Sequence, residues 1–271
     1  MSMFRWLAVS TNTYHGFSLE EALEGIARAG FRYIELSCVP DWTLHFRCDR
    51  AKEEDFRKLR QELAHFGLSV LSLSAHSNLA TEEGCAYLVS ALRCARELGA
   101  RVVNTGTVDR EEDENLLKKY LEWLSREAER CDVFLALEVH GDVFSSGRRL
   151  RELLEEVQLP HVGINYDTGN ALFYGNVRPE EDLQACLPWV VHMHLKDKRG
   201  GYRVWDFPPL GDGMVDFPTI FRILQEGEKD IPLSVEIEFD GHFEHPRSFV
   251  DVAVQRSFQY LQKILEEGGY W

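Results

Sequence analysis

The sequence predicts a (β/α)8 barrel, and three observations lead to that fold. Short apolar stretches with strand character alternate strictly with amphipathic helical stretches, the order expected of parallel strands joined by right-handed helical crossovers. Eight such units follow one another along the chain, which is the number that closes into a barrel. The chain has 271 residues with 44% hydrophobic content, enough for one large core, so a single domain over residues 1–271 is expected.

The first half of the chain supplies four of these units. A capping box from Ser18 to Glu21 opens the first helix, because its serine and glutamate satisfy N–H groups that the helix itself leaves free. Glycines close the first three helices, at Gly30, Gly67 and Gly99. The expected strands are 5–10, 31–36, 68–74 and 101–104, and the expected helices are 18–30, 49–66, 82–98 and 111–130.

The second half continues the alternation. The expected strands are 133–139, 162–166, 190–197 and 233–238, and the expected helices are 148–157, one that follows Pro179, 217–226 and 246–267. Three connections are longer than the rest, 39–50, 197–215 and 240–246, and long loops on a catalytic face usually act as lids or walls. Trp42, Trp205 and Phe207 lie on them, where an aromatic ring either covers a sugar or pins the loop in place.

Charge and composition narrow the classes of function. A formal net charge of -15 disfavours binding to a phosphate backbone, so no nucleic-acid partner is expected. The six cysteines form no CxxC pair, which favours a reducing cytoplasm. No apolar run approaches the ~20 residues of a membrane span, and the first six residues lack the plan of a signal peptide. The absence of GxxxxGK[ST], GxGxxG and GxSxG motifs argues against nucleotide hydrolysis, dinucleotide redox chemistry and hydrolase-type acyl transfer.

Ligand-type side chains end four strand-like stretches in the second half of the chain. A single acidic residue at such a position most often caps the next helix or is solvated. Four strands that end this way are better explained by one shared site, because the C-terminal ends of barrel strands meet at one face. The four residues are Glu138, Asp167, His194 and Glu236.

The stretch 190–197 is the centre of this pattern. Its His192, His194 and Lys196 face the same way, because side chains of a strand alternate with period two. Earlier strands offer further polar residues at the same rim, each of which equally well caps or hydrogen-bonds its neighbours. They are His15, Glu35, His76 and Asn104.

Five segments resemble the xylose isomerase-like barrels, specifically their sugar phosphate isomerase/epimerase group. They are LEVHG at 137–141, NYDTGN at 165–170, VHMHLKD at 191–197, LGDG at 210–213 and SVEIE at 234–238, and the likeness covers nearly the whole chain. The resemblance implies a divalent metal ion, manganese before magnesium, cobalt or zinc. Its implied ligands are Glu138, Asp167, His194 and Glu236.

The sequence departs from that family in two places and leaves one ligand open. Many relatives have a histidine where this chain has Asn170, and its absence favours a site with one metal ion. Most relatives have asparagine where this chain has Val139. Glu238 faces the same side as Glu236 two residues further on, so it is the alternative ligand.

Such a site suits proton transfer next to a carbonyl. A hard divalent ion chelated by the carbonyl and hydroxyl of a ketose would stabilise the enediolate that forms when the neighbouring proton leaves. Glu138 and Glu236 would act as acid and base, returning the proton to the other face of that carbon in an epimerisation or to the adjacent carbon in an isomerisation.

Six residues are expected to contact the substrate. Lys196 alternatively pairs with Asp197, and His140 alternatively orients Glu138 through a ring hydrogen bond. No phosphate-binding cluster is obvious, although Lys196, Lys198 and Arg199 are available for one. The six candidates are His76, His140, Asn170, Lys196, Trp42 and Trp205.

The leading hypothesis is therefore a cytoplasmic, metal-dependent isomerase or epimerase of a sugar, cyclitol or keto-sugar. A lyase or dehydratase is the alternative, because the same metal and base can eliminate a group β to the carbonyl. An apurinic endonuclease is disfavoured by the acidic charge and by Asn170. A non-catalytic sugar-binding barrel would not need both Glu138 and Glu236. The expected partner is a small molecule, and a homo-oligomer is left open.

Overall fold

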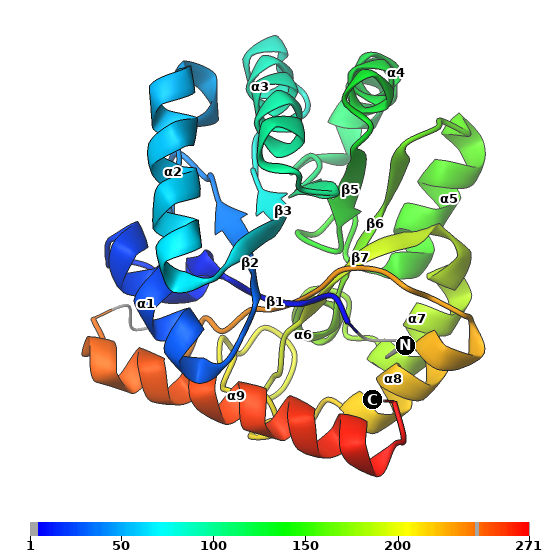
Figure 1. Ribbon diagram of the computed structural model, residues 1–271. Coiled ribbons are helices and arrows are strands. Elements are labelled where there is room, and N and C mark those ends of the chain that lie inside the picture. The colour runs from blue at the N-terminus through cyan, green and yellow to red at the C-terminus, as the bar shows by residue number, and fades with distance from the viewer. Residues whose placement is uncertain (1–4, 242–243, 271) are drawn as a thin grey trace.

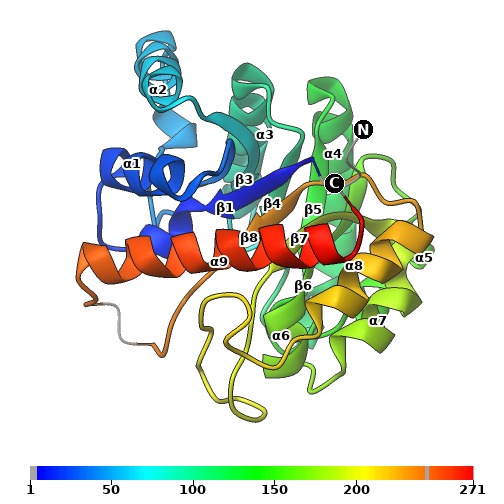
Figure 2. The same ribbon diagram turned by 60° about the horizontal axis from the view of Figure 1, so that its bottom comes forward.

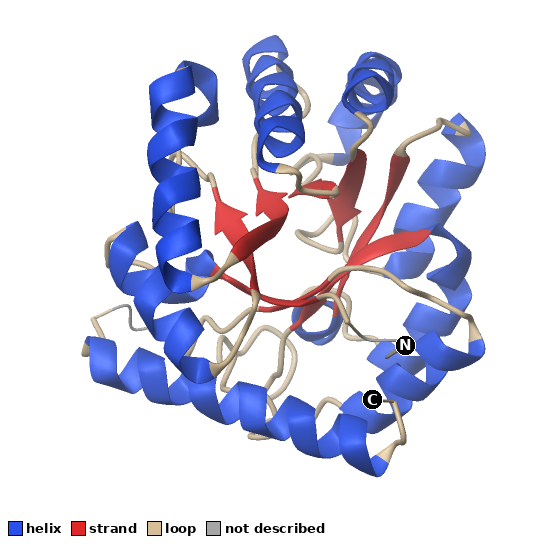
Figure 3. Ribbon diagram, in the orientation of Figure 1, coloured by secondary structure: helices blue, strands red, loops and turns tan. Residues whose placement is uncertain are grey.

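The computed structural model describes residues 5–241 and 244–270 and forms a closed barrel of parallel strands (Figure 1). The strands follow one another around the barrel in chain order, and β8 pairs with β1. Figure 3 shows the strands inside and the helices outside. This confirms the predicted (β/α)8 fold. The strands are β1 (Leu7–Ser10), β2 (Tyr33–Ser37), β3 (Ser69–Ser74), β4 (Val102–Thr105), β5 (Phe134–Glu138), β6 (Val162–Asp167), β7 (Val190–Leu195) and β8 (Leu233–Val235).

Most helices begin and end close to the predicted residues, but the second α-helix starts four residues and the fourth three residues later than expected, because a 3-10 turn occupies the predicted start. Ser18 caps the first helix through the expected box, in which the Glu21 N–H donates to Ser18 Oγ and the Ser18 N–H donates to Glu21 Oε2. Gly30, Gly67 and Gly99 end three helices in the left-handed conformation. The α-helices are α1 (Leu19–Ala29), α2 (Glu53–Phe66), α3 (Glu82–Leu98), α4 (Glu114–Cys131), α5 (Gly147–Val157), α6 (Thr168–Phe173), α7 (Pro179–Cys186), α8 (Phe217–Glu226) and α9 (Arg247–Glu267). Short 3-10 helices are η1 (Thr11–Tyr14), η2 (Cys48–Arg50), η3 (Glu111–Asp113) and η4 (Leu187–Trp189).

Two further elements differ from the prediction, and both differences lie at the site end of the barrel. The short helix α6 breaks the one-strand, one-helix alternation, because the Asp167 side chain caps it directly at the end of β6. The strand β8 stops at Val235, earlier than the expected 233–238. Beyond it the Ile237 N–H donates to the Thr13 hydroxyl instead of to a neighbouring strand. Both exceptions arise from side chains that take the place of backbone partners.

The polar end of the barrel carries the long connections. Figure 2 shows the loop of residues 197–215, in yellow, extending beside α6 from one end of the barrel. The interior beneath this end contains buried polar side chains, in contrast to the apolar layer between strands and helices. All six cysteines are described, buried and free of disulfides. Within the described residues no helix combines the length and apolar character needed to cross a membrane. The expectation of no signal peptide falls mainly on residues 1–4, which lie outside the described residues.

Candidate active site

Four side chains from consecutive strand ends converge in the barrel. Glu138 ends β5, Asp167 ends β6, His194 is the fifth residue of β7, and Glu236 follows β8 directly. The Nδ1 atom of His194 lies 3.3 Å from Glu138 Oε2, 3.5 Å from Asp167 Oδ2 and 3.6 Å from Glu236 Oε2. Strand register explains the convergence, because Asp167 pairs with His194 across β6 and β7. The structure thus brings the four predicted ligands together.

The carboxylate of Asp167 indicates what this cluster can hold. Its Oδ1 accepts the Asn170 N–H at 2.8 Å and caps α6, while its Oδ2 is buried without a hydrogen-bond partner. Burial raises the pKa of Asp167, and Lys196 and His194 lower it in part. This oxygen lies 3.5 Å from His194 Nδ1 and 3.7 Å from Lys196 Nζ, and a buried carboxylate oxygen without a hydrogen bond is unfavourable unless a cation compensates it. The donor set of Glu138, Asp167 and His194, with Glu236 next to His194, therefore fits a divalent metal ion.

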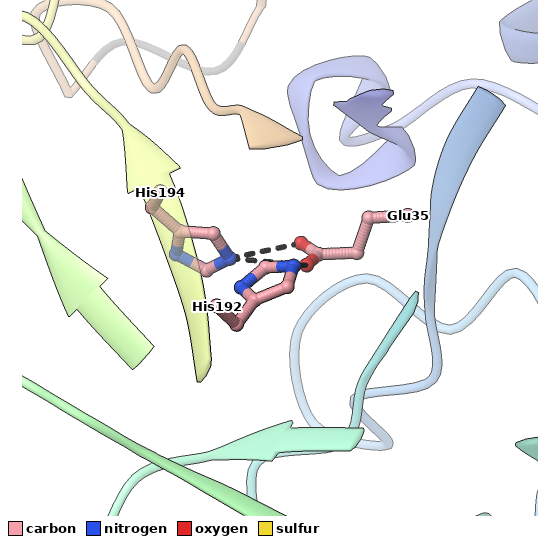
Figure 4. A group of neighbouring side chains, drawn as sticks. All are labelled: Glu35, His192 and His194. Atoms are coloured by element: carbon pink, nitrogen blue, oxygen red, sulfur yellow. Dashed lines mark hydrogen bonds and ion pairs between the residues drawn. The ribbon is translucent and has the colours of Figure 1, made fainter. Parts of the chain in front are cut away.

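The imidazole of His194 is held from its other side by Glu35. Its Nε2 lies 3.0 Å and 3.1 Å from the two oxygens of Glu35, which approach from β2 (Figure 4). Burial lowers the pKa of His194, but Glu35 and the other carboxylates outweigh it, and the pKa stands well above its usual range. The raised pKa keeps both ring nitrogens protonated, with Nε2 directed at Glu35 and Nδ1 at Glu138, Asp167 and Glu236, so a metal ion would have to displace the Nδ1 proton to bind there.

A second group of ligand-type residues, Glu35, His192 and His194, lies deeper in the barrel. Its hydrogen bonds are already complete, since Glu35 accepts from Ser72 Oγ at 3.1 Å and from Asn104 Nδ2 at 2.7 Å. Burial raises the pKa of Glu35, but His194 and His192 outweigh it and lower the pKa to about 2. This group orients His194, and the partly unsatisfied group above it is the better metal site.

The carboxylate of Glu138 is fixed by three neighbours. Its Oε2 accepts from Asn165 Nδ2 at 2.9 Å and lies 3.1 Å from His76 Nε2, and its Oε1 accepts from Asn170 Nδ2 at 3.0 Å. Burial raises the pKa of Glu138, but His194 and His76 outweigh it, and the net shift is downward. The side chain is therefore ionised at neutral pH, as a ligand or a base must be.

Glu236 and Glu238 have different surroundings. Glu236 lies beside His194, accepts from Asn12 Nδ2 at 3.0 Å and pairs with Lys196 Nζ at 3.0 Å. Glu238 pairs with Lys196 and accepts from Asn12 Nδ2 at a longer 3.4 Å. Only Glu236 of the two has an ion-pair distance to His194 among the described contacts. The geometry favours Glu236 as the ligand and places Glu238 beside it on the wall.

A cavity of about 260 Å³ opens above these residues. Trp42, Tyr174 and Trp205 supply aromatic surfaces, and Glu138 and Glu236 reach its wall. Aromatic faces combined with a few convergent polar groups are typical of small-molecule sites. All six predicted substrate-binding residues, His76, His140, Asn170, Lys196, Trp42 and Trp205, line this cavity.

Two of the alternatives expected from the sequence differ from the structure. Lys196 pairs with Glu236 and Glu238 and not with Asp197, because its side chain points into the barrel. His140 does not supply the ring hydrogen bond to Glu138. That bond comes from His76, and His140 Nε2 instead lies 3.3 Å from the Tyr174 hydroxyl. The remaining rim candidate, His15, contacts Thr43 and stacks on Trp42.

Asp197 instead organises the long loop that follows β7. Its Oδ2 accepts the N–H groups of Gly211 and Gly213, and its Oδ1 accepts those of Lys198 and Val215. A Cβ atom on Gly213 would lie 2.2 Å from Asp197 Oδ1, so the approach requires glycine. This buried carboxylate explains why the LKD and LGDG segments occur together, and it fixes the loop that carries Trp205.

We expect Asp197→Ala to release this loop while the barrel stays folded. Several N–H groups would lose their acceptor, each at about 1–3 kcal/mol if it remained buried, so the loop should open to water instead. Limited proteolysis with mass spectrometry should detect new cleavage between residues 198 and 214. Asp182→Ala is the matched control, since Asp182 accepts the Gly147 and Arg148 N–H groups far along the chain from this loop. Equal cleavage of the loop in both variants would contradict this role.

Some site residues lay outside the expectations from the sequence. Asn12, on η1, hydrogen-bonds Glu236 across 224 positions, and Asn165 links Glu138 to His192. Tyr174 lines the cavity at the residue after α6. Asn165 precedes Asp167 by two positions on β6, so period-two alternation could have indicated it. Nothing in the local sequence marks Asn12.

Comparison with known proteins gives a consistent result. Residues 23–263 match the sequence profile described as "Xylose isomerase-like TIM barrel". The L-ribulose-5-phosphate 3-epimerase UlaE of Escherichia coli is 25% identical over 234 residues, which cover 80% of this chain and 81% of that protein. An inosose dehydratase of Clostridium botulinum is 28% identical over 155 residues, covering 51% of this chain and 52% of that protein. Some curated relatives are thus matched over less than two thirds of their length.

The fold is also shared with solved structures. A xylose isomerase-like TIM barrel protein from Mycobacterium smegmatis, solved in complex with magnesium, superposes with a TM-score of 0.81 and covers 99% of both chains. The sequence identity is 18%, so this likeness concerns the fold.

Proposed function

This chain belongs to the xylose isomerase-like TIM-barrel family, and we propose that it is a divalent-metal-dependent sugar isomerase or epimerase that transfers a proton next to a carbonyl group. One observation carries the proposal: two carboxylates, Glu138 and Glu236, line one cavity and both lie beside His194, next to Asp167 Oδ2, which has no hydrogen-bond partner. The epimerase name of the E. coli relative UlaE supports the reaction class.

The proposed metal ligands are Glu138, Asp167, His194 and Glu236, and manganese is the proposed ion. A bound divalent ion would polarise the substrate carbonyl and stabilise the negative charge that develops on its oxygen. The hard carboxylate oxygens of this set suit manganese or magnesium, whereas no cysteine among the described residues lies in the cluster. We expect the protein to act in the cytoplasm, because its six thiols are unpaired and buried.

The chain's own residues would move the proton. A carboxylate oxygen of Glu236, held by Asn12 and Lys196, removes the proton from the carbon beside the carbonyl. Glu138, held by three hydrogen-bonding neighbours, takes up a proton from solvent when the substrate binds and returns it from the other side, and Glu236 afterwards releases the proton that it removed to solvent. Return to the same carbon inverts it, and return to the adjacent carbon moves the carbonyl. The aromatic rings of Trp42 and Trp205 exclude water and hold the sugar.

A lyase or dehydratase is the second candidate, favoured by the relative named inosose dehydratase. The same base would remove the proton, but a leaving group β to the carbonyl would depart in place of proton return. Product analysis separates the two reactions, because a lyase forms an unsaturated product and an epimerase or isomerase does not.

Asp167→Asn tests the metal site directly. The asparagine keeps an oxygen to cap α6 but lacks the charge of the free Oδ2, so Mn²⁺ affinity in calorimetry should fall by at least about 10-fold. Asp216→Asn is a matched control, since Asp216 caps α8 through the same type of bond to Thr219. We expect this control to bind Mn²⁺ like the parent protein. Unchanged Mn²⁺ affinity in Asp167→Asn would contradict the proposed ligand set.

The reaction itself is tested by incubating Mn²⁺-loaded protein with a panel of ketoses in deuterated water. NMR should show deuterium at the carbon next to the carbonyl together with an isomeric product. The proposed activity would be rejected if no ketose gave exchange or an unsaturated product.

A further inference from the structure

The described lining of the cavity is rich in carboxylates and poor in cations. Glu138, Glu236 and Glu238 reach the wall, and Asp167 lies beneath them. Lys196 is the single lysine or arginine among the described lining residues. A site of this composition attracts a metal cation but offers little to an anionic group of a substrate.

The charge of Lys196 is already balanced. Its Nζ lies 3.0 Å from Glu236 Oε2 and 3.7 Å from Asp167 Oδ2, and it also pairs with Glu238. The ammonium group sits 4.5 Å from the centre of the Phe207 ring and is almost completely buried. A divalent ion and Lys196 together balance the three ligand carboxylates, Glu238 adds one more negative charge, and His76 is paired with Glu138, so little positive charge is left for a phosphate.

The cations of the long loop are also held away from a phosphate role. Lys198 is buried and its ammonium donates to the carbonyl oxygens of Arg199, Gly200 and Gly201. Arg199 donates from Nε to the Asp212 carbonyl oxygen at 2.9 Å. These two residues, which the sequence offered for a phosphate site together with Lys196, therefore form no such cluster.

Arg203, on the same loop, lies beside one residue of the cavity wall. Its guanidinium lies 5.2 Å from the ring centre of Tyr174, a lining residue, but it forms an ion pair with Asp142. The histidines of the wall are likewise engaged, because His76 contacts Glu138 and His140 contacts Tyr174. The groups left to meet a substrate are amides, hydroxyls and aromatic faces.

We propose that the site takes an uncharged ketose or cyclitol ketone and discriminates against its phosphate ester, an inference that rests on the proposed function. Uncharged hydroxyl groups can bond to Ser74 and to the side-chain oxygen of Asn170 and pack against Trp42 and Trp205. A phosphate dianion would meet Glu238 and an already neutralised Lys196. Juxtaposed like charges disfavour binding strongly, so specificity here arises from repulsion as well as from contacts.

The test compares two matched pairs of probes on Mn²⁺-loaded protein: L-ribulose with L-ribulose 5-phosphate, and D-fructose with D-fructose 6-phosphate. Binding is measured by NMR titration, which does not depend on turnover, and solvent deuterium exchange is followed in the same samples. We expect at least one free ketose to bind on the order of 100-fold more tightly than its ester.

Each outcome separates this inference from the proposed function. Esters that bind as tightly as the free ketoses, or more tightly, overturn the inference, and exchange on those esters leaves the proposed function standing. A free ketose that binds preferentially without exchange or elimination supports the inference and contradicts the proposed reaction. Binding of neither class overturns both.

Two charge variants strengthen the test. Glu238→Gln removes one negative charge from the wall and should reduce the ratio of ketose affinity to ester affinity about 10-fold. Glu156→Gln removes one negative charge from the exposed side of α5, where Glu156 pairs with Lys118, and should leave this affinity ratio unchanged. An equal change in both variants would show that total charge, and not the charge of the wall, sets the preference, and would overturn the inference.

Discussion

Glu236→Gln is expected to slow solvent deuterium exchange on an active ketose by about 10²- to 10⁴-fold, the usual loss when a positioned general base is removed. Glutamine keeps the shape of the side chain and its contact with Asn12, but it cannot accept the proton. Glu238→Gln should slow exchange by less than about 10-fold. Glu238 lies on the same wall, yet it pairs with Lys196 and has no described contact with His194.

The comparison of the two variants is made at saturating Mn²⁺, so that weakened metal binding does not appear as lost proton transfer. Circular dichroism and thermal unfolding should be similar for both proteins. If exchange persists in Glu236→Gln and disappears in Glu238→Gln, the roles of the two glutamates at the end of β8 are reversed.

Glu35→Gln is expected to weaken Mn²⁺ binding by about 10- to 100-fold although Glu35 belongs to a different strand and is not a proposed ligand. The Glu35 carboxylate accepts a hydrogen bond from His194 Nε2 and so keeps Nδ1 directed toward the proposed ion. An amide at this position would place a donor against Asn104 or His194 and disturb the ring. Breaking a buried ionic contact should also lower the metal-free unfolding free energy by roughly 3–5 kcal/mol.

Calorimetry with Mn²⁺ and urea unfolding of the metal-free protein measure the two effects separately. Glu127→Gln is the matched control, because Glu127 is a buried glutamate of α4 that pairs with Arg130 on the outside of the barrel. It should lose stability without losing Mn²⁺ affinity. If Glu35→Gln unfolds more easily but binds Mn²⁺ normally, Glu35 supports the core and does not orient His194.

The fold was predictable because each local signal agrees with the architecture. Ser18 and Gly30 delimit the first helix in sequence and in structure, and apolar runs mark the strands. The exceptions depend on tertiary partners. Helix α6 starts because the Asp167 carboxylate turns back to the Asn170 N–H, and β8 is cut short where Thr13 supplies an acceptor. Neither side-chain partner is visible in hydrophobic periodicity.

The proposed ligands were predictable from their positions at strand ends, whereas the residues that hydrogen-bond to them were not. Strand ends converge in any closed barrel, so Glu138 and His194 could be assigned to one face before their contacts were known. The contact of His194 with Glu35 joins residues 159 positions apart, and the distance depends on how the barrel closes. For the same reason the sequence could not show whether Lys196 faces Asp197 or the cavity.

The carboxylate of Asp197 has a further consequence for how such a barrel diversifies. It accepts backbone N–H groups from Lys198 and from Gly211, Gly213 and Val215. Both ends of the intervening segment are therefore held close to the end of β7. Within this segment Phe207 packs against Lys196 and pairs with Phe239, so the stretches on either side of Phe207 are the parts whose length and side chains can change without moving His194 or Lys196. Changes in this segment can therefore alter the aromatic wall, and with it the substrate preference, while the residues proposed to transfer the proton keep their positions.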